Sequence, residues 1–182
     1  YCQDHVPVVE QREAVGHAVR ANYLYAGVAD LYAETGEEAL LNALERLWQD
    51  VTMRKMYITG ATGAINQSVS ISGDKVGEAY GRPYELPNAY AYNETCANLC
   101  NAMFSHRMLG IHGQSKYADI MELVMYNSGL SGIGLEGKDY YYANNLRVIR
   151  GARDYDMLVN DFEERQHYLT CFCCPPNLVR NV

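Results

Sequence analysis

Four segments whose apolar residues recur every three to four positions set the strongest limit on how this chain can fold. They are residues 13–35, 37–53, 95–109 and 115–127. The second shows the pattern most clearly, since one stripe of a helix collects Leu40, Leu44, Leu47, Trp48 and Val51. The first ends at Thr35-Gly36, a typical helix stop. Helices of these lengths pack as antiparallel pairs joined by short turns, so the pattern predicts an all-α fold.

The composition favours a folded chain and argues against two classes of partner. The 182 residues are 48% hydrophobic and 20% charged, which is not the composition of a disordered segment. One or at most two domains are expected at this length. The net charge of −7, with no cluster of Lys and Arg, argues against a nucleic-acid partner. No run of apolar residues is long enough for a membrane span, so no membrane partner is expected.

The ends of the chain suggest a piece of a larger protein. It begins at Tyr1 without an initiator Met and stops at Val182, directly after its densest motif. No signal-peptide pattern is visible, so the N-terminus does not indicate a compartment. Cytoplasm and periplasm both stay open, since reduced thiols suit the first and a bound metal can protect them in the second. The oligomeric state is not indicated.

The stretch between the second and third segments, roughly residues 57–93, contains many glycines and prolines, and we expect no regular element in it. It also holds five tyrosines, which a disordered segment would not. Long ordered loops in compact domains are usually functional, so we interpret this stretch as an active-site loop. Residues 139–149, DYYYANNLRVI, are predicted to form a short strand or hairpin.

The densest group of reactive side chains is the run Cys171–Asn177, CFCCPPN, with three thiols in four residues. Pro175 favours extended backbone at Cys174, and we expect a helix to begin after the two prolines. Thiols at a helix entrance have lowered pKa values, which favours the thiolate that binds metals or attacks electrophiles. The alternative is a buried or disulfide-linked cluster, because CxCC is not a standard zinc spacing.

A second group is Glu94 and Cys96, at the predicted start of the third helix. On a straight helix they would point about 200° apart, so both reach one metal only if Glu94 lies at or before the first turn. With Cys173 and Cys174 they would complete a tetrahedral zinc site of three sulfurs and one oxygen. The negative charge of the four ionised ligands exceeds the positive charge of zinc, so neighbouring cations or hydrogen-bond donors are needed to stabilise the site. Cys100 could pair with Cys96 as a ligand, but a core position is favoured.

Two further candidates stand alone in the sequence. Glu78 lies on the long loop within GEAY, where a single carboxylate is normally an ordinary surface group. His17 is expected on the first helix between small residues, where a lone histidine is more often part of the core. The remaining histidines have no comparable surroundings; they are His5, His106, His112 and His167.

Taken together, these motifs resemble the β-L-arabinofuranosidases of glycoside hydrolase families 127 and 146. The matching runs are REAVGHAVR at residues 12–20, YELPN at 84–88, YNETCA at 92–97 and CFCCPPN at 171–177. They occur in order over essentially the whole chain, which is far more specific than any one of them.

The resemblance implies a six-hairpin (α/α)6 barrel, with residues 1–182 forming part of a single catalytic domain that includes the long loop and a short β hairpin. It implies a zinc ion held by Glu94, Cys96, Cys173 and Cys174. The implied activity is retaining hydrolysis that releases β-linked L-arabinofuranose from plant glycans, so the expected partner is an arabinose-containing oligosaccharide or glycan. A full barrel needs twelve helices, so we expect the 182 residues alone to be inactive or only weakly stable.

The resemblance also implies roles for single residues. Cys173 would be the nucleophile and Glu78 the general acid/base. His17, Tyr142 and Glu94 match positions that contact the sugar. Cys171 matches a flanking cysteine that is not a ligand.

Two other interpretations stay open. The chain could be a non-catalytic helical domain with a structural zinc site, in which Glu78 would be an ordinary surface residue. It could also be another (α/α)-barrel carbohydrate enzyme, such as an epimerase, which gives no role to the four-ligand cluster. A Glu78 carboxylate that faces the Cys173 sulfur would favour the hydrolase.

Overall fold

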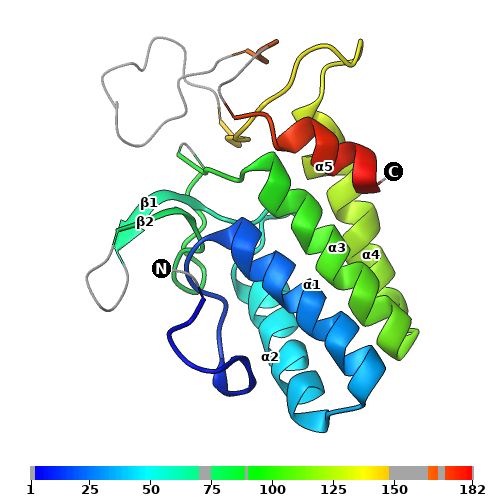
Figure 1. The fold of residues 1–182 in the computed structure, drawn as a ribbon. Coiled ribbons are helices and arrows are strands. Elements are labelled where there is room, and N and C mark those ends of the chain that lie inside the picture. Colours follow the sequence, from blue (N-terminus) through cyan, green and yellow to red (C-terminus); the bar gives the residue numbers. More distant parts are fainter. Residues whose placement is uncertain (1–2, 70–74, 89, 148–163, 168–170, 182) are drawn as a thin grey trace.

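The computed structural model describes residues 3–69, 75–88, 90–147, 164–167 and 171–181, and in these it is mostly helical (Figure 1). The α-helices are α1 (Ala18–Thr35), α2 (Glu38–Arg54), α3 (Thr95–His112), α4 (Ser115–Leu123) and α5 (Cys174–Asn181). A π-helical segment, η2 (Val124–Gly129), continues α4, and short 3-10 turns lie at η1 (Val8–Glu10) and η3 (Leu130–Gly132). None of the helices in this part of the chain is long and apolar enough to cross a membrane.

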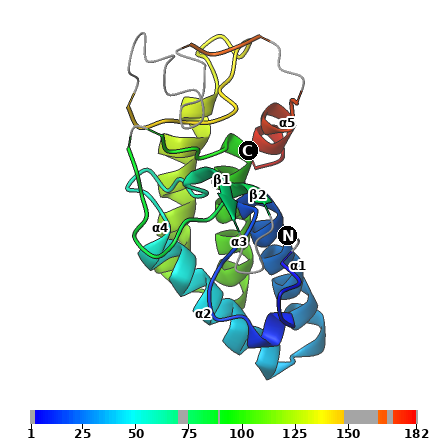
Figure 2. The ribbon, with the colours of Figure 1, turned by 90° about the vertical axis from the view of Figure 1, so that its left-hand side faces the viewer.

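Two helical hairpins, α1 with α2 and α3 with α4, form the body of the structure, and α1 lies beside α3 (Figures 1 and 2). Each hairpin turns at a glycine in the left-handed region, Gly36 with φ 67° and Gly113 with φ 64°. Glycine adopts this conformation without the steric cost that a Cβ imposes. The predicted antiparallel pairs with short turns, and the stop at Gly36, are confirmed.

The core lies between these hairpins and follows the predicted stripe of α2. Leu44, Leu47 and Val51 are fully buried. Trp48 packs edge-on against Tyr117 of α4, with ring centroids 4.5 Å apart, and its Nε1 donates a hydrogen bond of 3.1 Å to a serine of α3. Burying one large apolar side chain contributes about 1.5–3 kcal/mol, so α2 is held chiefly by this face.

The segment before α1 is extended, and the prediction that residues 13–17 belong to the first helix is wrong. Gly16 has φ 76° and its carbonyl accepts a hydrogen bond from the Tyr80 backbone N–H at 2.9 Å. Ala14 is fixed by a buried ion pair, because its N–H donates to Asp50 and its carbonyl accepts from Lys55 at 2.6 Å. His17 is therefore the N-cap residue of α1 and lies outside the helix.

A β hairpin lies within the long loop, so the expectation that residues 57–93 contain no regular element is wrong. Strand β1 (Ile65–Val69) pairs antiparallel with β2 (Lys75–Ala79), with Ile65 opposite Ala79. Val76 and Ala79 are buried. Most of the glycines and prolines of the loop flank the hairpin, and the only described strand residue among them is Gly77, so they mark the limits of the strands rather than the absence of strands.

The described part of the segment 139–149, residues 139–147, contains no strand, so that prediction is wrong there; residues 148 and 149 lie outside the described residues. Tyr140 bridges Ile133 and Gln166, whereas Ala143 bridges Glu94. Because successive residues pair with different segments, no ladder extends.

Helix α5 begins at Cys174, before the two prolines, and the prediction that it begins after them is wrong. Pro175 and Pro176 occupy its first turn. The first N–H groups of a helix have no intrahelical partner, so prolines are tolerated at these positions.

Two matched glycine substitutions test this packing. A Cβ on Gly60, which has φ 80°, would lie 2.8 Å from Val124 Cγ2 and 3.0 Å from Val124 Cα, whereas a Cβ on Gly27 of α1 meets nothing within 4 Å. We expect Gly60→Ala to lower the free energy of unfolding by about 2 kcal/mol or more, and Gly27→Ala to raise it by up to about 1 kcal/mol. Urea denaturation of the two variants measures this, and equal midpoints would contradict the placement of Gly60.

Candidate active site

Glu94 lies at the boundary between the long loop and α3. It is the N-cap residue, with φ −51° and ψ 134°, and Cys96 is the second residue of the helix. Asn93 before it has φ 48°, a left-handed conformation that asparagine tolerates better than most residues. The predicted condition for a shared ligand site, that Glu94 precede the first turn, is met.

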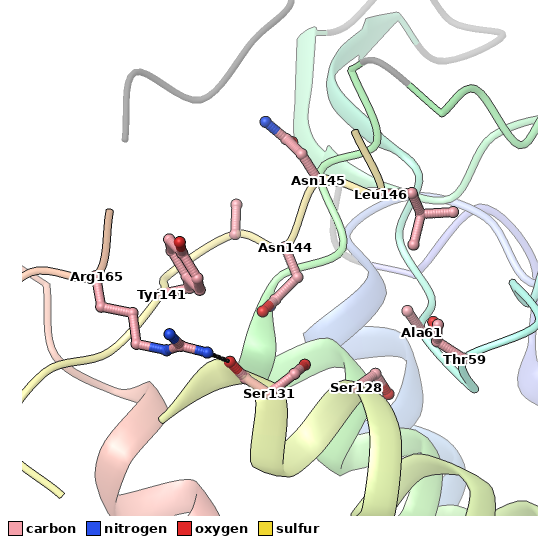
Figure 3. Close-up of a pocket in the computed structure, with 10 residues that line it drawn as sticks. Thr59, Ala61, Ser128, Ser131, Tyr141, Asn144, Asn145, Leu146 and Arg165 are labelled. Atoms are coloured by element: carbon pink, nitrogen blue, oxygen red, sulfur yellow. Dashed lines mark hydrogen bonds between the residues drawn. The ribbon is translucent and has the colours of Figure 1, made fainter. Parts of the chain in front are cut away.

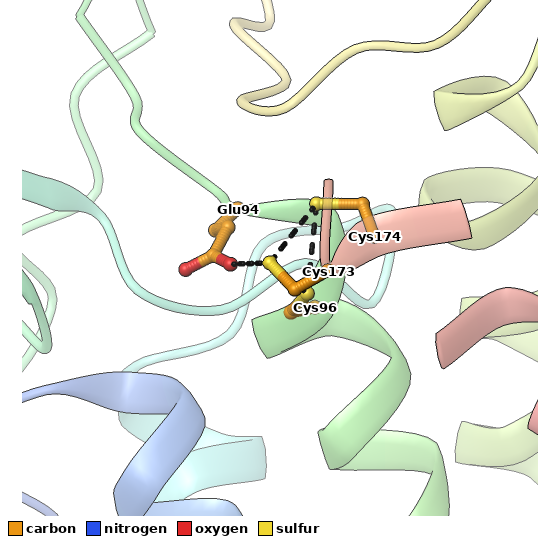
Figure 4. A group of neighbouring side chains, drawn as sticks. All are labelled: Glu94, Cys96, Cys173 and Cys174. Atoms are coloured by element: carbon orange, nitrogen blue, oxygen red, sulfur yellow. Dashed lines mark hydrogen bonds between the residues drawn. The ribbon is translucent and has the colours of Figure 1, made fainter. Parts of the chain in front are cut away.

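The start of α5 brings Cys173 and Cys174 against Glu94 and Cys96 (Figure 4). Cys96 Sγ lies 3.0 Å from Cys173 Sγ and 3.5 Å from Cys174 Sγ, and the last two sulfurs are 3.9 Å apart. Glu94 Oε1 lies 3.4 Å from Cys173 Sγ. All four ligand atoms lie within 4.8 Å of one another, so the residues expected to meet do meet.

These four residues fit a tetrahedral metal centre. Metal–sulfur bonds of about 2.3 Å place the sulfurs of a tetrahedron about 3.8 Å apart. Two of the three spacings, 3.5 Å and 3.9 Å, are close to this value, and the third, 3.0 Å, is shorter. The same spacings far exceed a disulfide bond, and the five cysteines in the described residues are free thiols. Glu94 Oε2 is buried without a hydrogen-bond partner in the described residues, as expected of a ligand oxygen. Three thiols and one carboxylate are a donor set that suits zinc.

The four acidic groups of this cluster shift one another's pKa values. Burial, and then the charge of Glu78, raise the pKa of Glu94 to about 9. Hydrogen bonding to Cys173 raises the pKa of Cys96 and of Cys174. Hydrogen bonds from Cys174 and Cys96 lower the pKa of Cys173 to about 2. These shifts are those of neighbouring acids that share protons, and a divalent cation bound here would displace such protons.

Glu78 lies on β2 beside this cluster, with φ 55°. Its Oε2 lies 2.7 Å from His17 Nε2, and its Oε1 accepts hydrogen bonds from Tyr92 at 2.8 Å and Tyr142 at 3.1 Å. The hydrogen bond from His17 lowers the pKa of Glu78, against burial, which raises it. The hydroxyl of Tyr142 is also 3.9 Å from the sulfur of Cys173. Glu78 is therefore part of the site and not an ordinary surface carboxylate.

Sequence reasoning missed Tyr92, which is buried and donates to Glu78. Its position two residues before Glu94, within the tyrosine-rich loop, was the available signal. Tyr142 was named only through the family resemblance, whereas His17 was also noted from its sequence surroundings, and both touch Glu78. His17 also approaches the metal cluster, since one ligand atom each from His17, Glu78 and Glu94 lie within 4.8 Å of one another.

The other candidates lie outside the four-residue cluster. Cys100 is buried one turn beyond Cys96, as expected of a core residue. Cys171 is exposed, with its sulfur 3.7 Å from that of Cys173. His112 pairs with Glu45 and His167 with Asp139. His5 and His106 are exposed.

Two hollows near the tyrosine run 140–142 lie outside the cluster. One, of about 170 Å³, is lined by Tyr141 and Arg165, and the guanidinium of Arg165 lies over the Tyr141 ring at 4.8 Å and donates to the Ser131 carbonyl (Figure 3). The other, of about 380 Å³, is lined by Tyr140 and Phe172 among others. The cluster residues line neither. The tyrosines at 140–142 therefore have different surroundings: Tyr140 packs against Cys96 and Cys174, and Tyr142 donates to Glu78.

Comparison with known proteins places this geometry in a family. Residues 1–182 match the family model described as β-L-arabinofuranosidase, GH127 catalytic domain. A curated relative, a non-reducing end β-L-arabinofuranosidase from Bifidobacterium longum, is 37% identical over 180 residues, which is 99% of this chain and 26% of the relative.

Solved structures agree. A chain described as a glycoside hydrolase has a TM-score of 0.90 and 51% identity, over 98% of this chain and 30% of that one. A GH127 β-L-arabinofuranosidase from Geobacillus stearothermophilus T6 has a TM-score of 0.86 and 44% identity, over 99% of this chain and 27% of that one. The chain thus spans about a quarter of the length of the curated relative it matches.

Metal analysis of cysteine variants tests the cluster. We expect the protein that contains this chain to bind one divalent metal ion per chain, and Cys96→Ser or Cys174→Ser to lose it, because a serine hydroxyl is a poor substitute for a thiolate. Cys100→Ala is the matched control, since that thiol lies outside the cluster, and it should keep the metal. Mass spectrometry of metal content after gel filtration measures this. A full metal complement in Cys96→Ser would contradict the assignment.

Proposed function

Because the chain belongs to the GH127 β-L-arabinofuranosidase catalytic-domain family, we propose that it is part of a retaining glycoside hydrolase that releases β-linked L-arabinofuranose from plant glycans. The observation that carries the proposal is the meeting of an acid–base carboxylate with a thiolate cluster. The hydroxyl of Tyr142 lies 3.1 Å from Glu78 Oε1 and 3.9 Å from Cys173 Sγ, so both groups face one site. The arrangement of α1 to α4 as two hairpins, with α5 beginning a further element, supports one domain built as part of an (α/α)6 barrel.

The metal in this proposal is zinc, held by Glu94, Cys96, Cys173 and Cys174. When bound, zinc would keep these sulfurs ionised at neutral pH and fix their positions. Among the three sulfur ligands, Cys173 is half-buried and the other two are fully buried. A sugar can therefore reach Cys173, and not Cys96 or Cys174, so Cys173 is the nucleophile.

In the first half of the reaction, the Cys173 thiolate attacks the anomeric carbon of the sugar. The carbon–sulfur bond forms as the bond from that carbon to the leaving oxygen breaks, and the carboxyl of Glu78 gives its proton to that oxygen. His17 Nε2, 2.7 Å from Glu78, is the neighbour that can pass this proton to the carboxyl before the attack and take it back after the second half. The product of this half is a thioglycosyl group on Cys173.

In the second half, the Glu78 carboxylate removes a proton from water, and that water displaces the Cys173 sulfur from the anomeric carbon. Two displacements at one carbon retain its configuration. The lowered pKa of Glu78 keeps the carboxylate in the basic form that this half requires. Tyr92 and Tyr142 hold Oε1 by hydrogen bonds, so the carboxylate is oriented before the water arrives.

The other two interpretations account for less of the site. A purely structural metal site requires neither the three donors on Glu78 nor a ligand sulfur that is partly exposed. An epimerase of similar architecture has no use for the four-ligand cluster.

The test of this proposal compares Cys173→Ser with Tyr142→Phe in the full-length protein on an aryl β-L-arabinofuranoside. We expect Cys173→Ser to lower kcat at least about 1,000-fold, because it removes the nucleophile, and Tyr142→Phe on the order of 10-fold, because it removes one orienting hydroxyl. Glu78→Gln with a good leaving group should accumulate a pentosyl adduct on the Cys173 peptide, visible by mass spectrometry. Substantial turnover by Cys173→Ser would sink the thiolate mechanism.

The pH dependence tests the pair His17–Glu78. The hydrogen bond from His17 lowers the pKa of Glu78, so the base form persists toward acidic pH and is lost only as pH falls through this lowered value. His17→Leu should raise the pKa of Glu78 and move the acidic limb of the pH profile of kcat to higher pH. The profile is measured with a substrate for which the second half of the reaction limits the rate. His106→Leu, on the exposed face of α3, is the control. An unmoved limb in His17→Leu would count against Glu78 as the base.

A further inference from the structure

Asn177 of α5 makes two contacts that tie it to the thiolate cluster. Its side-chain Nδ2 donates a hydrogen bond of 3.1 Å to Cys96 Sγ. Its backbone N–H donates to the Cys173 carbonyl at 3.1 Å, within the first turn of α5. Asn177 is buried, so its amide group does not exchange these contacts for water. An amide outside the set of ligands thus contacts a fully buried sulfur of the cluster.

Tyr23 of α1 fixes which end of that amide faces the sulfur. Its hydroxyl donates a hydrogen bond of 2.5 Å to Asn177 Oδ1 and accepts one of 3.4 Å from Arg180 Nη1. Because Arg180 occupies a lone pair of the hydroxyl, the hydroxyl proton is directed to the amide oxygen. The amide NH₂ group must then point to Cys96 Sγ, where the reverse orientation would set an oxygen against the sulfur.

A thiolate at Cys96 needs such a donor. Cys96 is fully buried, so water cannot solvate its thiolate. Four acidic ligands outweigh the charge of one divalent cation, and hydrogen bonds to the ligand atoms are the usual compensation. Cys174 Sγ, by contrast, faces the carbonyl oxygen of Tyr142 at 4.0 Å, which cannot donate to a thiolate.

We propose that Tyr23 and Asn177 are positioning residues for the metal centre: they hold an N–H donor on Cys96 Sγ and so strengthen metal binding without being ligands. The inference rests on the metal site of the proposed function. Three helices contribute, with Tyr23 on α1, Cys96 on α3 and Asn177 on α5. The pair therefore links the metal centre to the packing of α5 on the two helical hairpins.

The experiment titrates metal into the full-length protein after chelation under reducing conditions. Zn²⁺ affinity is measured by competition with a chromophoric chelator, and Co²⁺ replaces it to give a sulfur-to-cobalt charge-transfer band. Asn177→Leu should weaken Zn²⁺ binding about 10- to 100-fold. It should also move the charge-transfer band to longer wavelength, because a sulfur without a hydrogen-bond donor releases its electrons more easily. Tyr23→Phe should change both in the same direction and by less.

Matched controls are Asn127→Leu and Tyr126→Phe, exposed residues of η2 that do not contact the cluster. Both should keep wild-type affinity and band position. Wild-type protein that binds neither metal would overturn the proposed metal site itself, and the inference with it. If the wild type binds both metals, and Asn177→Leu and Tyr23→Phe have the same affinity and band position as the wild type, the inference is overturned but the proposed metal site is not.

A weaker affinity with an unmoved band would mean that the pair only braces the helices, and this also overturns the inference. If Asn177→Leu does not fold, Tyr23→Phe decides, since it removes a single hydroxyl and leaves the asparagine in place.

Discussion

Four acidic groups crowded into one buried place dominate this structure. Glu94, Cys96, Cys173 and Cys174 bring their ligand atoms within 4.8 Å of one another, and three of these residues are fully buried. Four negative charges cannot be held there without a cation, and without one the cluster must retain protons. The two pairs of ligands lie far apart in the sequence, so their only link is through space. Binding of a divalent cation by these residues would therefore be coupled to the docking of α5 against α3.

The opposite side of the site depends on backbone geometry. The buried pair Asp50–Lys55 holds Ala14 by both its N–H and its carbonyl, and this fixes the extended segment that leads to His17. That segment pairs with the end of β2, which carries Glu78. Glu78 and Asn93 both have positive φ, a conformation that costs about 1–3 kcal/mol for a residue with a side chain. Strain at the carboxylate and at the entrance to the metal cluster is thus supported by packing elsewhere.

The features of the fold and the site that could be predicted from the sequence are mainly those set by residues close together in the chain. The apolar stripe of α2, the stop at Gly36 and the place of Glu94 before α3 follow from neighbouring residues, and they were predicted. Predictions were wrong for the hairpin, the N-cap position of His17 and the early start of α5. His17 pairs with Ala79, far away in the sequence, whereas the glycines and prolines around the hairpin and the prolines of α5 were read as breaking elements that they only limit or begin. The roles of Glu78 and Tyr142 came from a family resemblance alone. Tyr92 and Asn177 were missed because the side-chain contacts that bring them to the site, with Glu78 and Cys96, reach residues 14 and 81 positions away.

The two carboxylates of the site show how one fold gives similar groups different tasks. Glu94 is almost fully buried beside other acids, which raises its pKa to about 9, and this suits a group that ionises only when a cation replaces its proton. Glu78 receives hydrogen bonds from His17, Tyr92 and Tyr142, which lower its pKa and suit a group that exchanges protons with substrate and water. Environments that separate the pKa values of two carboxyl groups in this way are typical of sites that carry out acid–base chemistry. The sulfurs differ in the same way, because Cys173 is half-buried with a lowered pKa, whereas Cys96 and Cys174 are fully buried with raised pKa values; the proposed mechanism assigns attack to the first and metal binding to all three.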